Sequence, residues 1–541
     1  MPRRADDLAP TNPLADALLV DAYEFTMAYA WWKNGHAERA AVADLYFRRN
    51  PFGGEFTVFA GLAEVERFLS SYRFSPEHIE RLRTLLPAGT DLGFFDWLRA
   101  LTLDRVRVRA LREGSLAFPR VPLLMIEGPI AQVQLLETAL LTLVNYPTLV
   151  ATAAARLRLA AGPDKRLLEF GLRRAPGVDG GISASRYAYI GGFDATSDVK
   201  AADLFPALPV AGTHAHAFVQ SYLGLADAEL CGFTAADGSL FDLKDAALHY
   251  RAQLDAQHTH DGELAAFLAY AAAYPTAFLA LVDTYDTLKS GLPNFLVVAL
   301  ALHQAGYAPL GIRLDSGDLA YLSRQARAAF EAVSARFSVP FARLAIIASN
   351  DLDEATLLHL NVQGHQIDTF GIGTRLVMPG EALGAVYKLT AVDGHPRIKV
   401  SGDSAKITIP GRKNAYRLFA GSGDRAEPVA VVDLMTLADE EPPAAGQPVL
   451  CRHAFEETKR VLVTPRQVEE LLTVVWDGAA QHHALQPLGQ VRAAVLEQLA
   501  HFRQDHLRAA NPTPYKVSVS ARLYDFVHDL LAREVPVAEI R

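Results

Sequence analysis

Short apolar runs alternate with helical patterns through the middle of the chain, and this alternation constrains the fold more than any other feature. Seven runs are candidate strands, at residues 167–172, 189–193, 210–213, 277–283, 309–314, 344–348 and 367–372. Helical segments at 218–223, 294–305, 319–333 and 354–360 lie between several of them. Near-continuous apolar strands separated by helices predict a parallel sheet covered on both faces. About eight such units close a barrel, so the pattern favours an α/β barrel, with an open doubly wound sheet as the alternative.

Polar or small residues follow these strands at the same point of each unit. They are Arg173, Asp194, Thr213, Asp283, Asp315, Ser349 and Gly373. In parallel α/β folds the carboxyl ends of the strands face the ligand. The recurrence therefore predicts a binding site at one mouth of the barrel.

The sequences on either side of this region lack its regular alternation of strands and helices. An Asp393-Gly394 turn joins the apolar runs 386–392 and 397–400, which is a hairpin signal. Short β runs continue at 407–409 and 416–419, and residues 21–150 mix helices with short strands such as 56–59. We expect an N-terminal mixed, sandwich-like domain at 1–150 joined by 386–439, a barrel domain at 151–385 and a C-terminal domain at 440–541. Residues 440–448 read as a linker, and Thr464-Pro465-Arg466-Gln467 reads as the start of a helix.

Composition excludes several classes of protein. The chain has 541 residues, is 50% hydrophobic and carries a net charge of −9, which is unlike a disordered chain or a general nucleic-acid binder. Two cysteines, Cys231 and Cys451, give no disulfide framework or zinc spacing and fit a reducing cytoplasm. The N-terminus has no apolar segment typical of a signal peptide. We expect a cytoplasmic protein without nucleic-acid or membrane partners.

One apolar stretch, residues 264–282, has the length of a membrane span. It is rich in alanine, and Pro275 divides it. The first half is typical of a packed helix and the second of a buried strand ending at Asp283, so we predict that it does not cross a membrane.

Two segments carry cations or imidazoles at strand ends. Arg173 and Arg174 are suited to a carboxylate or phosphate, because guanidinium offers a fixed fork of donors; on a strand only one of them would face the ligand. His214 and His216 follow the strand at 210–213. A neutral imidazole there is nucleophilic and can accept a phosphoryl group, although a structural role is the alternative for either histidine.

Three further segments suit a phosphorylated sugar. Arg313 and Asp315 alternate with apolar neighbours and so share one face, where they can hold an anion and hydroxyl groups. Ser349 follows the next strand. Gly371, Gly373 and Thr374 form a loop after the last strand, a frequent phosphate site in barrels.

These segments together resemble the nicotinate phosphoribosyltransferase family. The resemblance runs in order along nearly the whole chain through DAYEFTMAYAWW (from Asp21), YFRRNPFGGEFTVFAGL (from Tyr46), EGPIAQVQLLETALLTLVNYPT (from Glu127), EFGLRRAPGVDGGISASRYAYIGGFDATSD (from Glu169), AGTHAHAF (from Ala211), LVDTYDT (from Leu281), GIRLDSGDL (from Gly311), FGIGTRLV (from Phe370), YKLTAVDG (from Tyr387) and NPTPYKVSVS (from Asn511). It implies the incomplete α/β barrel of type II phosphoribosyltransferases, with an N-terminal sandwich-like domain and a C-terminal extension. It also implies a homodimer with active sites at the subunit boundary.

The resemblance further implies a reaction. Nicotinate and 5-phosphoribosyl-1-pyrophosphate (PRPP) give nicotinate mononucleotide and pyrophosphate for NAD biosynthesis, coupled to ATP hydrolysis through a phosphohistidine, with Mg²⁺ bound to the substrates. His216 fills the phosphohistidine position, while His214 stands where members often have an apolar residue. Asp283 would orient the imidazole or assist magnesium. Tyr23, reaching over from a partner subunit, and Phe170 would enclose the pyridine ring, and Thr213 would contact nicotinate. Arg313 and Asp315 would hold the substrate carboxylate or phosphate and the ribose. Gly373 and Thr374 would bind the 5′-phosphate.

The choice between acid and amide substrate depends on Ser197. The sibling family that uses nicotinamide carries an acidic residue in the matching loop, which accepts a hydrogen bond from the amide. A hydroxyl at Ser197 can donate to a carboxylate without repelling it. The sequence therefore favours nicotinate. Nicotinamide, quinolinate and a non-catalytic paralogue are the alternatives.

Overall fold

The computed structural model describes residues 10–230, 232–401, 406–421, 427–478 and 485–535. Cys231 and the first nine residues, on which two of the sequence expectations depend, lie outside these ranges. The chain forms two compact units: unit 1 holds residues 1–155, 190–192 and 380–541, and unit 2 holds residues 156–189 and 193–379. The domain boundaries expected from the sequence remain a prediction.

Unit 2 is built on one parallel sheet of six strands. The strands are β6 (Arg166–Glu169), β7 (Ala195–Thr196), β8 (Leu279–Leu281), β9 (Gly311–Leu314), β10 (Ala345–Ser349) and β11 (Thr369–Ile372). Their order in the sheet is β7-β6-β11-β10-β9-β8, and every neighbouring pair is parallel. The sheet is open between β7 and β8, so the incomplete barrel expected from the sequence is confirmed.

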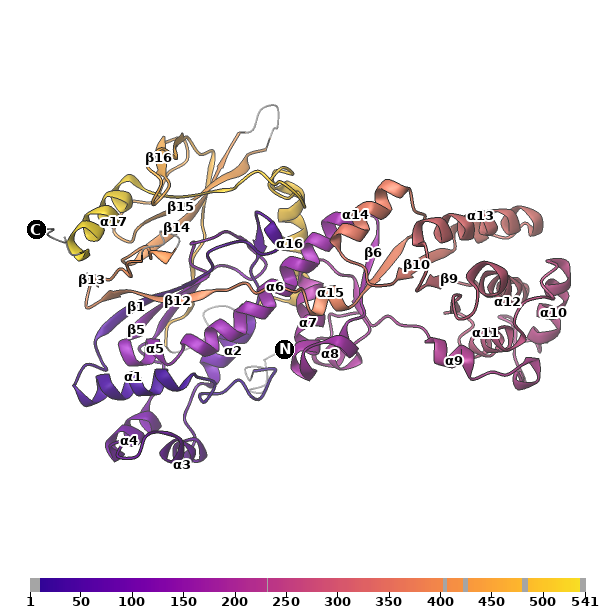
Figure 1. The fold of residues 1–541 in the computed structure, drawn as a ribbon, viewed down its shortest axis with the longest axis horizontal. Coiled ribbons are helices and arrows are strands. Elements are labelled where there is room, and N and C mark those ends of the chain that lie inside the picture. The colour runs from indigo at the N-terminus through magenta and orange to yellow at the C-terminus, as the bar shows by residue number, and fades with distance from the viewer. Residues whose placement is uncertain (1–9, 231, 402–405, 422–426, 479–484, 536–541) are drawn as a thin grey trace, which may run out of the picture. The chain divides into compact units, whose positions relative to one another are not determined.

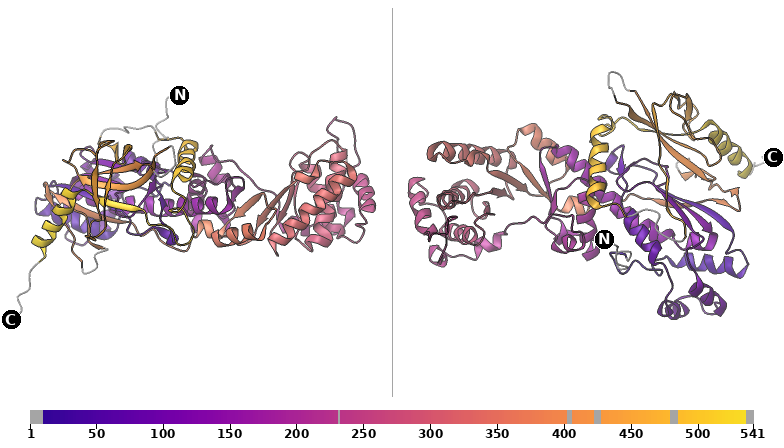
Figure 2. Two further views of the ribbon diagram at one scale, coloured as in Figure 1. Left: turned by 90° about the horizontal axis from the view of Figure 1, so that it is seen from above. Right: turned by 180° about the vertical axis from the view of Figure 1, so that it is seen from behind.

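Helices follow the strands of unit 2. They are α7 (Gly177–Ile190), α8 (Val199–Leu204), α9 (His216–Gln220), α10 (Leu243–Gln253), α11 (Asp261–Ala273), α12 (Leu292–Gln304), α13 (Leu319–Phe337), α14 (Glu354–Gln363) and α15 (Thr374–Val377). Aspartate side chains cap the N-termini of several of these helices. Asp318 accepts a hydrogen bond from the backbone amide of Tyr321 in α13, and Asp353 accepts one from the backbone amide of Thr356 in α14. Helices α10 to α13 gather at the β8–β9 end of the sheet (Figures 1 and 2).

Four sequence expectations need correction. Residues 189–193 are not a strand, because α7 continues to Ile190 with Ala184, Tyr187 and Ala188 buried at helical spacing. Val210–Thr213 makes only an isolated parallel bridge, Val210 to Thr196. Of the hairpin, 386–392 forms β12, but its partner β13 spans only His395–Pro396, and 397–400 and 407–409 form no strand. Thr464–Gln467 does not begin a helix, because Gln467–Glu470 pairs with another strand.

Unit 1 contains two larger sheets and a two-stranded one, β2 (Thr57–Val58) with β4 (Leu116–Ala117). The first sheet has the order β13-β12-β1-β5-β3-β19, from β1 (Ala40–Tyr46), β3 (Arg107–Ala110), β5 (Leu124–Pro129), β12 (Val386–Val392), β13 (His395–Pro396) and β19 (Thr473–Trp476). The second has the order β17-β16-β20-β15-β14-β18, from β14 (Lys413–Ala420), β15 (Val429–Leu437), β16 (Val449–Arg452), β17 (Arg460–Val463), β18 (Gln467–Glu470) and β20 (Lys516–Val519).

The helices of unit 1 come from both ends of the chain. They are α1 (Ala22–Lys33), α2 (Leu62–Ser71), α3 (Pro76–Leu85), α4 (Leu92–Ala100), α5 (Ile130–Gln134), most of α6 (Glu137–Ala161), α16 (Leu488–His501) and α17 (Ala521–Glu534). One hydrophobic core joins residues of α1 such as Phe25 to residues of α17 such as Val527. The two large sheets are also linked by a buried ion pair, because Lys413 Nζ lies 2.8 Å from Asp44 Oδ2.

One helical stretch of the described chain, Ile130–Ala161, is long and apolar enough to span a membrane, and 67% of its most apolar window is buried inside the structure. The stretch at 264–282 instead divides into α11 and β8 on either side of Pro275, as its sequence predicts.

Candidate active site

The carboxyl ends of β8, β9 and β10 bring together the side chains predicted from the strand ends of unit 2. Ser316 Oγ donates to Asp283 Oδ2 at 2.5 Å, which joins the ends of β8 and β9. Ser349 Oγ donates to Asp315 Oδ1, also at 2.5 Å, which joins β9 to β10. Asp283 Oδ1 is buried and has no hydrogen-bond partner among the described residues. One carboxylate oxygen therefore remains available at the centre of the group.

His216 lies at this group and begins α9. Its Nδ1 is 3.2 Å from Thr284 Oγ1, and its Nε2 is 3.5 Å from Asp315 Oδ2. The side chain is 38% exposed, so a ligand can reach it. The contacts that orient the imidazole thus come from Thr284 and Asp315. Asp283, expected to orient this ring or to assist a metal, accepts from Ser316 through Oδ2, and its expected role stays a prediction.

His214, two residues earlier, lies in a different environment. Only 8% of the residue is exposed, and its ring packs against Phe218, Phe267 and Tyr270. Its Nε2 accepts a hydrogen bond from the backbone amide of Leu281. Burial lowers the pKa of His214 to about 4, and Arg313 adds to the effect. His214 is therefore a neutral, enclosed acceptor, whereas His216 is open to a ligand.

Arg313 links the segment that carries both histidines to β9. Its Nη1 donates to Thr213 Oγ1 at 3.3 Å, and its Nη2 donates to the carbonyl of His214 at 3.2 Å. Burial lowers the pKa of the guanidinium, Arg173 adds to the effect, and Asp315 and Asp283 oppose it. Arg313 therefore lies within electrostatic range of Arg173 and of both carboxylates, and its guanidinium can bind an anion.

Phe170 lies directly above Gly371. A Cβ atom on Gly371 would come within 2.5 Å of the Phe170 ring, so only glycine allows this approach. Glu169 fixes the backbone beneath the ring, because it is buried and accepts from the amide of Gly171 and from Ser185 Oγ and Thr196 Oγ1. Burial raises the pKa of this carboxyl.

The remaining predicted residues of unit 2 surround this point. Arg173 and Arg174 lie in a short 3₁₀ helix, Leu172–Arg174, so the alternation expected on a strand does not apply to them. Arg174 Nη1 donates to Thr374 Oγ1 at 3.2 Å. The amide of Ser197 donates to the carbonyl of Glu169 at 2.9 Å. Gly373 precedes α15 and lies against the carbonyl of Phe170.

Tyr23 belongs to unit 1, where it lies in the first turn of α1 and is 44% exposed. Burial of the hydroxyl raises its pKa to about 12, and Glu137 and Glu24 add to the effect. The exposed ring is free to contact another molecule.

Sequence reasoning did not select three residues that contribute to this geometry: Thr284, Ser316 as a partner of Asp283, and Glu169. Thr284 directly follows the strand-end Asp283, so its position was the available signal. Nothing in the local sequence pattern distinguishes a Ser316 contact with Asp283 from helix capping by Ser316. Glu169 is an acidic residue inside an apolar run, and that combination indicates a buried, hydrogen-bonded carboxylate.

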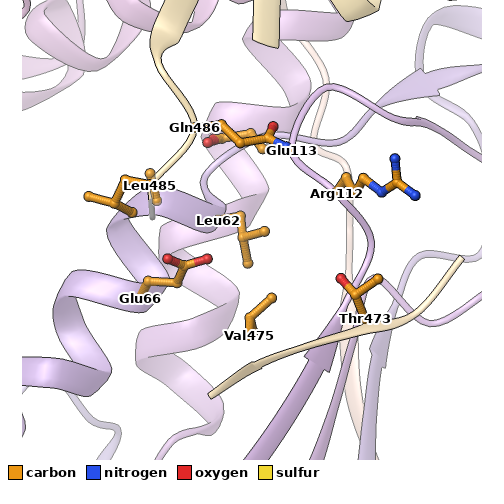
Figure 3. Close-up of a pocket in the computed structure, with 9 residues that line it drawn as sticks. Leu62, Glu66, Arg112, Glu113, Thr473, Val475, Leu485 and Gln486 are labelled. Carbon is orange, nitrogen blue, oxygen red and sulfur yellow. The ribbon is translucent and has the colours of Figure 1, made fainter. Parts of the chain in front are cut away.

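Unit 1 also contains a cavity of about 400 Å³, shown in Figure 3. Its lining includes Leu62 and Glu66 of α2, Arg112, Glu113 and Val475 of β19. None of the residues predicted from the sequence lines it.

Comparison with known proteins agrees with the resemblance noted in the sequence. The N-terminal domain model of nicotinate phosphoribosyltransferase matches residues 18–145, and the C-terminal domain model matches residues 412–527. Nicotinate phosphoribosyltransferase 2 of Arabidopsis thaliana is 50% identical over 98% of this chain and 97% of its own length.

Solved structures agree as well. The crystal structure of human nicotinic acid phosphoribosyltransferase has a TM-score of 0.85 and 44% identity, covering 95% of this chain and all of that one. A nicotinate-nucleotide pyrophosphorylase from Pyrococcus furiosus, at 20% identity and a TM-score of 0.57 over 93% of this chain and 98% of its own, shares the fold. Because close relatives match almost from end to end in sequence and in architecture, the chain belongs to the nicotinate phosphoribosyltransferase family.

Proposed function

We propose that this protein joins nicotinate to PRPP, forming nicotinate mononucleotide and pyrophosphate, and couples the reaction to ATP hydrolysis through phosphorylated His216. The observation that carries the proposal is the meeting of His216, Arg313, Asp315 and Asp283 at the strand ends of one open barrel. The family supports the substrates, and the geometry supports the roles of the residues. The product would serve NAD biosynthesis.

The pyridine acid would bind between Phe170 and the cationic group. Arg313 and Thr213 offer donors to its carboxylate, and the Phe170 ring offers an aromatic face, which is worth roughly 0.5–1.5 kcal/mol beyond burial. Ser197 supplies a hydroxyl where an acidic residue would favour the amide. The 5′-phosphate of PRPP would lie at Gly373 and Thr374, beside the Arg174 guanidinium, while Ser349 and Asp315 face the sugar.

His216 would act as the nucleophile toward ATP. The neutral imidazole attacks the γ-phosphorus, so that a P–N bond forms as the P–O bond to ADP breaks. Asp315, 3.5 Å from Nε2, stabilises the positive charge that develops on the ring. Water later breaks the P–N bond and releases phosphate. The exposure of His216 and the enclosure of His214 are the reasons for choosing His216.

Magnesium carried by the phosphates fits the carboxylates at this site. No group of three or more His, Cys, Asp or Glu side chains in the described residues is arranged to hold a metal by itself. Asp283 Oδ1, buried and without a hydrogen-bond partner among those residues, offers one oxygen ligand. Bound Mg²⁺ would neutralise charge on the leaving pyrophosphate.

We further infer a cytoplasmic homodimer in which Tyr23 reaches the pyridine site of the partner. The exposed Tyr23 ring and the scarcity of cysteine support these two inferences. An equilibrium sedimentation measurement that finds only monomers under assay conditions would contradict the dimer.

The test is a mononucleotide assay with PRPP, Mg²⁺ and one pyridine at a time. We expect product with nicotinate, much less with nicotinamide or quinolinate, and stimulation by ATP. His216→Ala should lose the stimulation by ATP while it keeps slow product formation, because binding of both substrates remains. A variant that keeps full ATP stimulation would overturn the phosphohistidine role, and a preference for nicotinamide or quinolinate would overturn the substrate.

A further inference from the structure

The sheet of unit 2 is open between its two edge strands, and residues 209–216 cross this opening. We call them the closing segment. At one end the segment pairs with β7, because the amide of Thr196 donates to the carbonyl of Pro209 at 3.0 Å and the amide of Ala211 donates to the carbonyl of Thr196 at 2.9 Å. At the other end it reaches β8 through a side chain, because His214 Nε2 accepts from the amide of Leu281 at 3.3 Å.

The Leu281 amide belongs to the free edge of β8. Along a parallel strand successive amides point to opposite sides, and the next amide, of Val282, already donates to the carbonyl of Arg313 in β9. An unpaired buried amide on the opposite edge would be costly. The imidazole of His214 therefore supplies the acceptor that a seventh strand would otherwise provide.

The surroundings of His214 keep its ring in place. The ring centroid lies 4.8 Å from that of Tyr270, 5.5 Å from that of Phe218 and 6.2 Å from that of Phe267. Two of these rings, Phe267 and Tyr270, belong to α11, so the closing segment is packed against a helix as well as hydrogen-bonded to β8. Nε2 accepts the Leu281 amide, so the neutral ring carries its proton on Nδ1.

The same segment carries the groups assigned to the chemistry. The carbonyl of His214 and the hydroxyl of Thr213 both accept from Arg313. His216 begins α9 two residues further on, and its Nδ1 lies 3.2 Å from Thr284, three residues beyond Leu281. The contact between His214 and Leu281 thus fixes the distance between the segment bearing His216 and the strand end bearing Thr284 and Asp283.

We propose that His214 is a positioning residue that closes the open barrel, its Nε2 holding the closing segment to the Leu281 amide so that His216 and Arg313 face the site. The catalytic part of this inference rests on the proposed function. The structural part, the side chain that replaces a strand, does not.

Three variants of His214 distinguish the hydrogen-bond acceptor at Nε2 from the packing of the imidazole ring. In His214→Gln the side-chain oxygen can reach the place of Nε2, in His214→Asn the oxygen reaches only the place of Nδ1, and His214→Leu has no acceptor. Hydrogen exchange at the Leu281 amide, followed by mass spectrometry on short peptides around β8, should rise about tenfold in the Asn and Leu variants and stay near the wild-type rate in the Gln variant.

Kinetics supply the second readout. In the Asn and Leu variants we expect kcat with ATP to fall about tenfold, with a smaller change in the KM for PRPP, and we expect the Gln variant to restore most of it. A loss of global stability alone would not be rescued selectively by Gln over Asn. Unchanged exchange at Leu281 in both the Asn and Leu variants would overturn the proposal, as would a Gln variant that behaves like Leu or fails to fold.

The two readouts also separate this inference from the proposed function. If the wild-type protein makes no nicotinate mononucleotide, the proposed function fails, yet the exchange at Leu281 still decides whether His214 closes the sheet. If the wild type is active and exchange follows the predicted order while kcat is equal in all variants, the positioning role is overturned.

Discussion

The two histidines of the closing segment are two residues apart, yet one is an enclosed acceptor and the other an open ring. Residue type and spacing could not separate them, because an extended chain would place both on the same side. The difference arises where α9 begins at His216 and ends the extended backbone. The Arg173–Arg174 pair shows the same limit, since a 3₁₀ turn replaces the strand that its neighbours predict. By contrast Asp283, Asp315 and Ser349 could be found from position alone, because each directly follows a buried run.

Arg313 provides a prediction at this scale. Its two terminal nitrogens contact different oxygens, on Thr213 and His214, and a lysine ammonium has no planar fork to bridge them. Arg313→Lys should raise the KM for nicotinate about tenfold or more and lower kcat as well, measured by steady-state kinetics. Arg324→Lys is the matched control, because Arg324 is exposed and its Nη1 donates to the carbonyl of Gln363 in the same unit. Equal KM values in the two variants would contradict the role of Arg313.

Between elements, the contact of β6 with β11 determines where the pyridine ring can lie. Gly371→Ala would place a methyl group 2.5 Å from Phe170 and displace the ring. We expect the KM for nicotinate to rise about two- to tenfold, the value of one aromatic stacking contact, while the KM for PRPP changes less. Gly489→Ala is the control, since no atom of the described residues lies within 4 Å of the added atom. If the alanine variant at Gly371 binds nicotinate as the wild type does, Phe170 does not contact the pyridine.

The turn after β8 provides a prediction of pH dependence. A π-helical turn, Thr287–Gly291, is held by Glu263 of α11, whose Oε2 accepts from Ser290 Oγ at 2.5 Å and from Asn294 Nδ2 at 3.1 Å. Burial raises the pKa of Glu263 from 4.5 to about 7. A raised carboxyl pKa gives the fold a stability that is present below pH 4.5 and lost as the pH rises through about 7.

Glu263→Gln removes this titration and keeps an acceptor for both donors. Between about pH 5 and about pH 8, the wild type should therefore lose stability that the variant keeps. The difference between their free energies of unfolding should change by about 1.4 kcal/mol for each unit by which the pKa of Glu263 is raised. Urea unfolding at the two pH values measures the difference. Glu331→Gln on the exposed face of α13 should show no such change. If the free energy of unfolding depends on pH in the same way for the wild type and for Glu263→Gln, the pKa of the Glu263 carboxyl is not raised.

The elements themselves were predictable where burial and propensity agree. Strands β8 to β11 and helix α12 follow from apolar runs, and helices α13 and α14 also have capping aspartates. The predictions failed where tertiary pairing decided the outcome. Thr464–Gln467 has the residues of a helix start, yet its last residue pairs with Phe419 of β14. Tyr189 and Ile190 are apolar enough for a strand, yet both form the last turn of α7, where Ile190 is buried.

For the whole molecule, the notable feature is the discontinuity of unit 1. Strand β19 pairs with β3, so residues 473–476 complete a sheet whose other strands come from 40–129 and 386–396. The core of the same unit joins Trp476, Val519 and Leu523 to residues near the N-terminus. Neither flank of the chain can bury its apolar surface without the other.

A chain that ends after residue 439 should therefore be insoluble when expressed alone, because it leaves the edge of β3 unpaired and part of the core exposed. Co-expression of residues 440–541 as a second chain should restore soluble protein, assessed by the soluble fraction and size-exclusion chromatography. A soluble, monomeric 1–439 chain with an intact β3, judged by hydrogen exchange, would refute this.

The pairing of β19 with β3 also sets an order of events during synthesis. At about 5–20 residues per second, the ribosome needs many seconds between the release of residue 110 and that of residue 473. Throughout that interval one edge of β3 is unpaired. All residues of unit 2 have been synthesised before β19 is made. The barrel is thus free to fold first, and the N-terminal sheet is completed only when translation is almost over.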